Sequence, residues 1–267
     1  MNIAFMGVKA GKSAVSYNLL AISTMAAVKY NLDVSVMQSN YDMNRIENAF
    51  MPVSSMICMK EDFAYYKRQG IDEMIDGIIM RREGDLYEEA LVKVNNTTLS
   101  YLPSTSETSS CVYERECEKV VDTLSSIIRK GNRITFVDCG VGKSVIDKNF
   151  LEKSDLIVVN LEQDNQPITK EMSEDRSFME KCVFVVGRYD SDSRYNLRTI
   201  KSKYRIDGKS ICAIPYNISF KDSVLEGRLV DFINRNIDCE IYDDNYEFIS
   251  GVDFATRMVL RKAGCNV

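Results

Sequence analysis

Residues 7–14 read GVKAGKSA, and they join the apolar run NIAF at residues 2–5 to the stretch VSYNLLAISTMAAVKY at residues 15–30. A glycine-rich turn between a strand and a helix directs backbone N–H groups and the positive end of the helix toward phosphate oxygens. Lys12 would neutralise phosphate charge, and the Ser13 hydroxyl would reach Mg²⁺. Gly7 and Gly11 enclose one residue fewer than the usual motif does. The stretch therefore predicts a loop that descends from a phosphate-binding loop, and it leaves open whether this loop still binds phosphate.

Short β-branched runs alternate with longer segments of helical periodicity along the chain. Strands are predicted at residues 2–6, 33–37, 98–101, 133–138, 156–161, 181–187 and 210–214. Helices are predicted at residues 13–29, 45–49, 71–82, 112–130, 149–153, 168–173, 197–203, 225–234 and 246–263. Strands rich in Val and Ile on both faces indicate a doubly wound, mostly parallel α/β sheet covered by helices on both faces. Without a convincing linker, the chain is expected to form a single domain over residues 1–267.

The composition argues against several classes of site. The chain has no histidine and its eight cysteines form no CxxC pair, so zinc sites and histidine-based triads are not expected. Cys139, Cys182 and Cys212 lie in or beside apolar runs, where a cysteine is usually a small buried hydrophobe. A net charge of −5 without a long block of one sign gives no strong nucleic-acid signal. Because the sequence has neither a signal-type leader nor a run of about 18 apolar residues, it predicts a cytoplasmic protein without a membrane span.

Asp138 ends the apolar stretch RITFVD at residues 133–138. A carboxylate at the carboxyl end of a parallel strand lies where Mg²⁺ bound to a nucleotide would lie. The alternative is that Asp138 caps the following helix. The sequence GVGKS at residues 140–144 looks like a second phosphate loop, but it follows Asp138 and lacks the required earlier glycine, so it is interpreted as a decoy.

The order of these motifs resembles that of the ParA and MinD group of P-loop ATPases, which carry a deviant Walker A motif. The resemblance rests on the N-terminal loop and helix and on FVDCG, LEKSDLIVVNLEQD, CVFVVGRYD, ICAIPYN and SVLEGRLVDF, and it covers nearly the whole chain. Within this group, MNIAFMG, LLAIS, RIENAF, YYKRQGIDEMID and LSYLPST are most similar to TadZ- and CpaE-like proteins of the Tad (Flp) pilus machinery. The receiver-like N-terminal domain common in that subgroup does not occur in this sequence.

The resemblance implies ATP and Mg²⁺ as cofactors and a homodimer that encloses nucleotide at the carboxyl edge of the sheet. The implied nucleotide-binding residues are Gly7, Lys9, Ala10, Gly11, Lys12, Ser13, Ala14, Arg188 and Pro215. The implied metal-side residues are Ser13 and Asp138.

The chain departs from the family pattern at its signature lysine and at its adenine contact. The lysine that reaches the partner's nucleotide normally lies five residues before the loop lysine, where this chain has Gly7. Lys9 substitutes for it only if the shortened loop places Lys9 suitably. The Asn that often recognises adenine is Gly187 here.

The acidic pair that ends the second strand in the family is Gln38 and Asn40 here, and Asp42 lies two residues later. An amide can hydrogen-bond water but cannot take its proton, so no catalytic residue is assigned with confidence. The sequence therefore predicts slow or absent ATP hydrolysis and leaves ATP binding open, since backbone amides and Lys12 would still supply much of the phosphate contact.

The predicted function is that of a ParA/MinD-like positioning or scaffold protein for pilus or secretion-system assembly. It would be cytoplasmic, peripheral to a membrane assembly or a cell pole, and partnered by pilus or secretion assembly proteins. Two alternatives stay open. One is an active ATPase switch for partitioning or positioning with ATP-dependent dimerisation, and the other is a nucleotide-independent interaction protein. The final segment, residues 246–263, is interpreted as a core helix rather than as a membrane-binding one.

Overall fold

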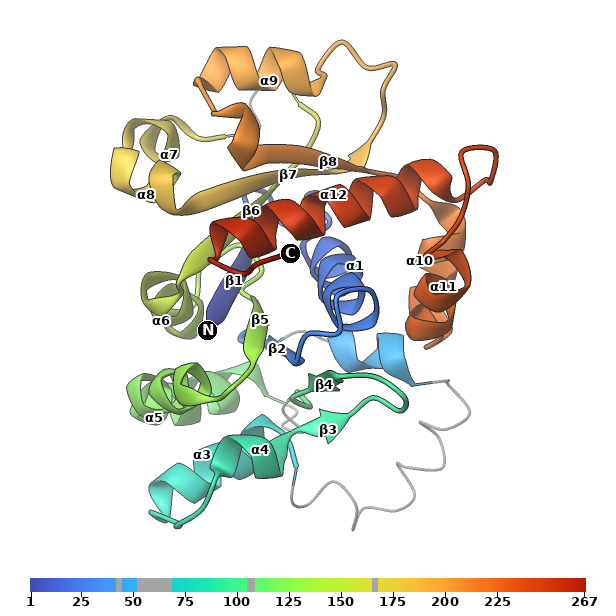
Figure 1. Ribbon diagram of the computed structural model, residues 1–267. Coiled ribbons are helices and arrows are strands. Elements are labelled where there is room, and N and C mark those ends of the chain that lie inside the picture. Colours follow the sequence, from blue (N-terminus) through green and yellow to red (C-terminus); the bar gives the residue numbers. More distant parts are fainter. Residues whose placement is uncertain (42–44, 52–68, 105–108, 165–167) are drawn as a thin grey trace.

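The computed structural model describes residues 1–41, 45–51, 69–104, 109–164 and 168–267. The strands of these ranges form one eight-stranded sheet in the order β3-β4-β2-β5-β1-β6-β7-β8. All neighbouring strands run parallel except β3 and β4, which are antiparallel. The strands are β1 (Asn2–Gly7), β2 (Val34–Gln38), β3 (Val92–Lys93), β4 (Leu99–Tyr101), β5 (Ile134–Asp138), β6 (Leu156–Leu161), β7 (Cys182–Tyr189) and β8 (Ile211–Pro215). This sheet confirms the predicted α/β fold (Figure 1).

The helices of the described ranges connect these strands. They are α1 (Val15–Val28), α3 (Ile71–Ile79), α4 (Leu86–Ala90), α5 (Ser110–Lys130), α6 (Val145–Lys153), α7 (Lys170–Glu174), α8 (Arg176–Lys181), α9 (Leu197–Tyr204), α10 (Ile218–Leu225), α11 (Leu229–Asn236) and α12 (Tyr246–Lys262). Two short 3-10 helices, η1 (Ile46–Phe50) and η3 (Gly208–Ser210), complete them.

Helices cover both faces of the sheet. On one face, α1, α10, α11 and α12 pack on strand residues such as Phe5 and Val158. On the opposite face, α3 to α6 pack on residues such as Ala4 and Val137, and α9 covers the end of the sheet near Val186. Because neither face meets water, β6 is buried along its whole length, which explains its continuous apolar sequence.

Some predicted helices differ from the observed ones. The helix predicted at residues 225–234 corresponds to α11, which begins four residues later at Leu229, because Gly227 has φ 69°, a left-handed conformation that ends α10 just before it. The predicted helix at residues 45–49 is the 3-10 helix η1. The sequence analysis missed β3, α4, α8 and α10, and of these β3 and α8 give no periodic apolar signal. β3 has two residues, and none of the residues of α8 is buried.

The final helix belongs to the core. Phe248, Val252 and Val259 of α12 are buried against the sheet and α1, as the interpretation of a core helix predicts. None of the helices in the described ranges is both long and apolar enough to cross a membrane.

Candidate nucleotide-binding site

The ends of three neighbouring strands bring the predicted site residues together at the carboxyl edge of the sheet. Gly7 ends β1, and Asp138 ends β5 beside it. Gln38 ends β2 and pairs with Asp138 from the other side. A Cβ at Gly7 would lie 2.8 Å from the side chain of Val15, so the chain needs glycine where the loop returns to α1. Parallel strands of this fold usually bind ligands at this edge.

The loop after β1 delays the start of the helix. α1 begins at Val15 and not at Ser13 as the sequence predicts, because Ala14 lies in the left-handed region with φ 52°. In the part of the chain that the structure describes, no side chain caps α1, so the N–H groups of its first turn can bind another acceptor. The partial positive charge of an uncapped helix N-terminus suits an anion such as phosphate.

The two lysines of the loop have different environments. Lys12 is exposed, and within the described ranges its side chain forms neither an ion pair nor a hydrogen bond. The Lys9 ammonium donates to Asp164 and lies 3.7 Å from a carboxylate oxygen of Glu162. The hydrogen bond to Asp164 raises the pKa of Lys9. Lys12 is therefore the loop cation available to a ligand, whereas the charge of Lys9 is neutralised within its own chain.

Ser13 and Asp138, the predicted metal-side residues, bond to other groups. Ser13 is 2% exposed, and its hydroxyl donates to the carbonyl of Lys9 at 3.1 Å. Asp138 accepts from the N–H of Gly140 at 2.9 Å and from the hydroxyl of Ser16 at 2.5 Å. Because both residues are only 2% exposed and their side-chain oxygens already form hydrogen bonds within the protein, these two residues do not fit Mg²⁺ as they stand. Ser16 is a hydrogen-bond partner of Asp138 that the sequence analysis missed.

The helix after β5 shows that Asp138 is not a helix cap. Ser144 caps α6 by accepting from the N–H of Asp147 at 3.0 Å, and Asp147 accepts from the N–H of Ser144 at 3.1 Å. The alternative role for Asp138 is therefore wrong. Because Ser144 of GVGKS is bound in this cap, the geometry supports the interpretation of that stretch as a decoy.

Gln38 is fixed by contacts within the protein. Its side-chain oxygen accepts from the N–H of Ile46 at 3.3 Å, and the Ser104 hydroxyl lies 3.4 Å from the same oxygen.

Ser104 also donates its N–H to Glu47 at 3.2 Å and its hydroxyl to Glu47 at 3.0 Å. Burial raises the pKa of Glu47. The sequence analysis missed this carboxylate, which the apolar neighbours in RIENAF indicate only weakly, and Asp42 lies outside the described residues.

Asn40 lies against Gly140 on the same edge. A Cβ at Gly140 would be 2.4 Å from the Asn40 side-chain nitrogen. The Asn40 side-chain oxygen is buried and has no hydrogen-bond partner among the described residues. Such an acceptor can take a hydrogen bond from water or from a ligand hydroxyl.

A pocket of about 240 Å³ opens beside the N-terminus of α1. Ala14 lines it together with the predicted residues Arg188 and Pro215, and the rings of Tyr17 and Phe220 form part of its wall. Its volume is below the range of about 300–1,000 Å³ that is usual for small-molecule sites, so it can take one ring of a ligand. The fold thus brings distant predicted residues to the start of α1.

Gly187 of β7 lies under the start of α1. A Cβ at this position would be 2.7 Å from the side-chain nitrogen of Asn18 and 3.1 Å from the Cβ of Ala14. Asn18 is held in place because it donates to Asn160 at 2.8 Å. No larger side chain fits at position 187 without displacing α1 or Asn18, which gives a packing reason for glycine at this position.

The chain has the fold of the ParA/MinD-type P-loop ATPases. The ParA family ATPase from Chlorobium tepidum has a TM-score of 0.69 at 14% identity, over 96% of this chain and 97% of that one. A chain of the MinC:MinD cell division protein complex from Aquifex aeolicus has a TM-score of 0.67 at 14% identity, over 100% and 97%. The septum site-determining protein MinD from Pyrococcus horikoshii, complexed with Mg-ADP, has a TM-score of 0.60 at 14% identity, over 99% and 98%. No protein-family model and no curated protein sequence matches this chain.

Proposed function

We propose that this chain is a ParA/MinD-like positioning or scaffold protein that binds ATP at the carboxyl edge of its sheet. The observation that carries the proposal is the ammonium of Lys12, which pairs with none of the described residues and lies three residues before the start of α1. A phosphate bound there would receive charge from Lys12 and hydrogen bonds from backbone N–H groups. The adjoining pocket with Arg188 and Pro215 offers a place for the base. The MinD structure with Mg-ADP supports a nucleotide as the ligand.

The proposed binding of phosphate does not require the protein to hold Mg²⁺. When bound to ATP, it would neutralise charge on the phosphates. Before Ser13 could hold Mg²⁺, its hydroxyl would have to give up the hydrogen bond that it donates to the Lys9 carbonyl. Asp138 would likewise have to give up the hydrogen bond that it accepts from Ser16. Their metal-side role stays a prediction, and phosphate binding by Lys12 and the helix end does not depend on it.

Hydrolysis is expected to be slow or absent. Gln38 stands where the family has a carboxylate, and an amide cannot accept a proton from the attacking water. The loss of such a group lowers the rate about 10²-fold or more. The measurement is steady-state phosphate release by the wild-type protein and by Lys12→Ala. A wild-type rate equal to that of active ATPases of this fold, abolished by Lys12→Ala, would contradict the expectation.

The cellular role proposed is assembly of a pilus or secretion system, based on the sequence likeness to TadZ- and CpaE-like proteins. The test is a pull-down from cells with wild-type protein, Lys12→Ala and the control Lys143→Ala, which removes the lysine of the decoy loop. Loss of pilus or secretion components with Lys12→Ala alone supports a nucleotide-dependent scaffold. Absence of such components from the wild-type sample would contradict the role.

A homodimer is part of the proposal, and static light scattering with and without Mg-ATP measures it. A mass that doubles with ATP and returns to the monomer value as ATP is hydrolysed would favour the ATPase switch instead. A dimer that persists after ATP is added favours the slowly hydrolysing scaffold.

A nucleotide-independent interaction protein is the second candidate. Two contacts favour it: the Ser13 hydroxyl donates to the Lys9 carbonyl, and the Lys9 ammonium is paired with Asp164. In both cases a group that could bind phosphate is already bound within the protein. This candidate predicts self-association and partner binding that are unchanged in Lys12→Ala.

A further inference from the structure

β8 lies at one end of the sheet, and among the described residues no strand pairs with its outer edge. An unpaired edge presents a row of backbone N–H and C=O groups that another extended segment can bind. The edge at the other end is β3, which has two residues, whereas β8 has five. β8 is therefore the longer of the two edge strands.

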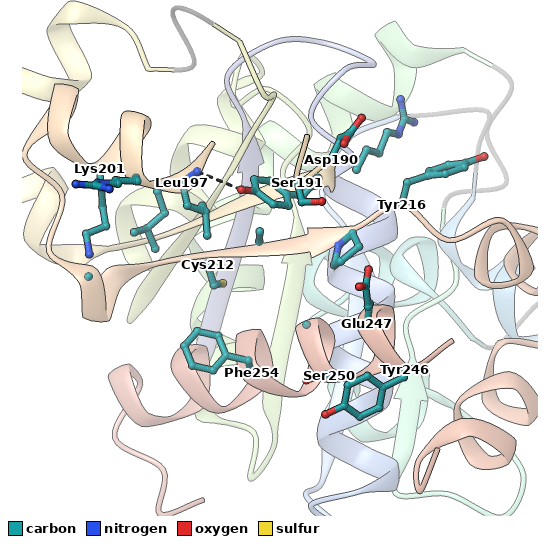
Figure 2. Close-up of a pocket in the computed structure, with 18 of the residues that line it drawn as sticks. Asp190, Ser191, Leu197, Lys201, Cys212, Tyr216, Tyr246, Glu247, Ser250 and Phe254 are labelled. Carbon is teal, nitrogen blue, oxygen red and sulfur yellow. Dashed lines mark hydrogen bonds between the residues drawn. The ribbon is translucent and has the colours of Figure 1, made fainter. Parts of the chain in front are cut away.

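The β8 edge lies in a groove of about 1,230 Å³ between two helices. Figure 2 shows Leu197 and Lys201 of α9 on one side of β8 and Ser250 and Phe254 of α12 on the other. This volume exceeds the range of about 300–1,000 Å³ that is usual for small-molecule sites. The groove is thus better suited to a segment of polypeptide than to a small molecule.

The groove offers apolar surface beside the strand edge. Phe254 is 52% exposed and Tyr216 is 54% exposed, although both have large rings. Alternate side chains of an extended segment point in opposite directions, so one set can pack on these rings while the other reaches the rim. Exposed aromatic side chains next to an unpaired edge favour a bound strand over a purely electrostatic contact.

The charge of the groove indicates the chemistry of that segment. The charged residues of its lining are Arg188, Arg198, Lys201, Arg257, Asp190 and Glu247. Arg257 is paired with Asp253 at 3.2 Å, but in the described ranges no ion pair is formed by Arg188, Arg198 or Lys201. The groove is therefore positive in a chain whose net charge is −5. Like charges would oppose pairing of two copies through this edge, whereas an acidic segment would be attracted.

We propose that this groove binds an acidic segment of a partner protein as an added strand on β8. The backbone of the segment pairs with the outer edge of β8, its apolar side chains contact Tyr216 and Phe254, and its carboxylates meet Arg198 and Lys201. Arg188, Pro215 and Tyr216 line both this groove and the pocket beside α1. The bound strand would lie next to the proposed nucleotide site, but the proposal does not depend on nucleotide binding.

The test measures fluorescence anisotropy of a labelled peptide of alternating glutamate and valine, about seven residues long to span β8. One control peptide has lysine in place of glutamate. A second keeps the acidic sequence but carries N-methyl groups at alternate residues, which removes the donors that pair with a strand. The variant Arg198→Glu/Lys201→Glu reverses two exposed charges of the groove, and Lys203→Glu changes an exposed lysine of α9 that does not line it.

The proposal predicts that the acidic peptide binds and that N-methylation or the double charge reversal each weakens binding at least about tenfold. The Lys203→Glu and Lys12→Ala variants should bind the acidic peptide as tightly as the wild-type protein does. Hydrogen exchange of the amides in residues 211–214 slows when the peptide is bound. Equal binding of the N-methylated peptide, no binding of the acidic peptide, or tighter binding of a DNA duplex with the same dependence on Arg198 and Lys201 would overturn the proposal.

Discussion

Lys12 and Lys9 lie in the same short loop, yet only one of them can serve a ligand. Lys9 is held by Asp164 and Glu162 from the segment after β6, so its charge is already balanced. Lys12 has no such partner among the described residues and lies just before an uncapped helix. The sequence could not separate these two lysines, because the acidic partners of Lys9 are more than 150 residues away in the chain.

Glu47 gives a pH-dependent prediction. Because burial raises its pKa above the ordinary value of 4.5, the folded state binds the proton more tightly than the unfolded state does. Stability from this group is full below pH 4.5 and is lost as pH rises through the higher folded pKa. Glu47→Gln keeps an acceptor for the Ser104 N–H and is expected to stabilise the protein at pH 7 by about 1 kcal/mol.

The measurement is urea unfolding of Glu47→Gln at pH 7 and at pH 4. The difference from wild type should shrink toward pH 4, where the wild-type carboxyl is protonated in both states. The control Glu114→Gln, an exposed residue of α5, should show no such pH dependence. A loss of stability with Glu47→Gln at pH 7 would contradict the cost assigned to this carboxylate.

Gly187 gives a packing prediction. Gly187→Ala places a Cβ 2.7 Å from Asn18, so α1 must shift, and the expected loss is about 1–3 kcal/mol in the free energy of unfolding. Gly208→Ala is the matched control, because its new Cβ would meet only the flexible end of Lys201. If chemical denaturation finds equal stability for the two variants, the close packing of β7 on α1 is refuted.

At the scale of elements, the strands other than β3 could be predicted because they are short, mostly apolar runs that are largely buried on both faces, whereas the two-residue β3 is not buried. The start of α1 could not be predicted. Ala14 has high intrinsic helix propensity, and its left-handed conformation depends on the packing of α1 against β7. Ser16 and Glu47 were missed for a similar reason: each acquires its role from contacts with distant residues, Asp138 and Ser104 respectively.

The conformation of Ala14 leads to a prediction about the loop and α1. A residue with a Cβ pays about 1–2 kcal/mol to adopt the left-handed region, and glycine does not. Ala14→Gly should therefore stabilise the nucleotide-free protein by about 1 kcal/mol, while the β-branched Ala14→Val should destabilise it by a similar amount. Thermal unfolding of the three proteins compares them. The opposite order would mean that α1 begins before Ala14, as the sequence alone predicts.

At the scale of the whole molecule, the core shields cysteine thiols in different parts of the sheet from solvent. Cys139 follows β5, Cys182 begins β7, and Cys212 lies in β8, and all three are buried. Burial raises the pKa of Cys182 and of Cys212 to about 12. These thiols should resist iodoacetamide at pH 8 until the protein unfolds, whereas the exposed Cys111 should react. Mass spectrometry of the alkylated peptides measures the labelling of each cysteine. Rapid labelling of Cys212 in the folded protein would contradict this packing.

The central claim is that the short loop before α1 still binds nucleotide through Lys12. Isothermal titration calorimetry of Mg-ATP tests it most directly, with wild-type protein, Lys12→Ala and the control Lys143→Ala, each shown to be folded by circular dichroism. The account predicts binding by the wild type, a loss of at least about tenfold in Lys12→Ala, equivalent to about 1.4 kcal/mol, and little change in Lys143→Ala. No binding by the folded wild-type protein, or equal binding by all three, would contradict it.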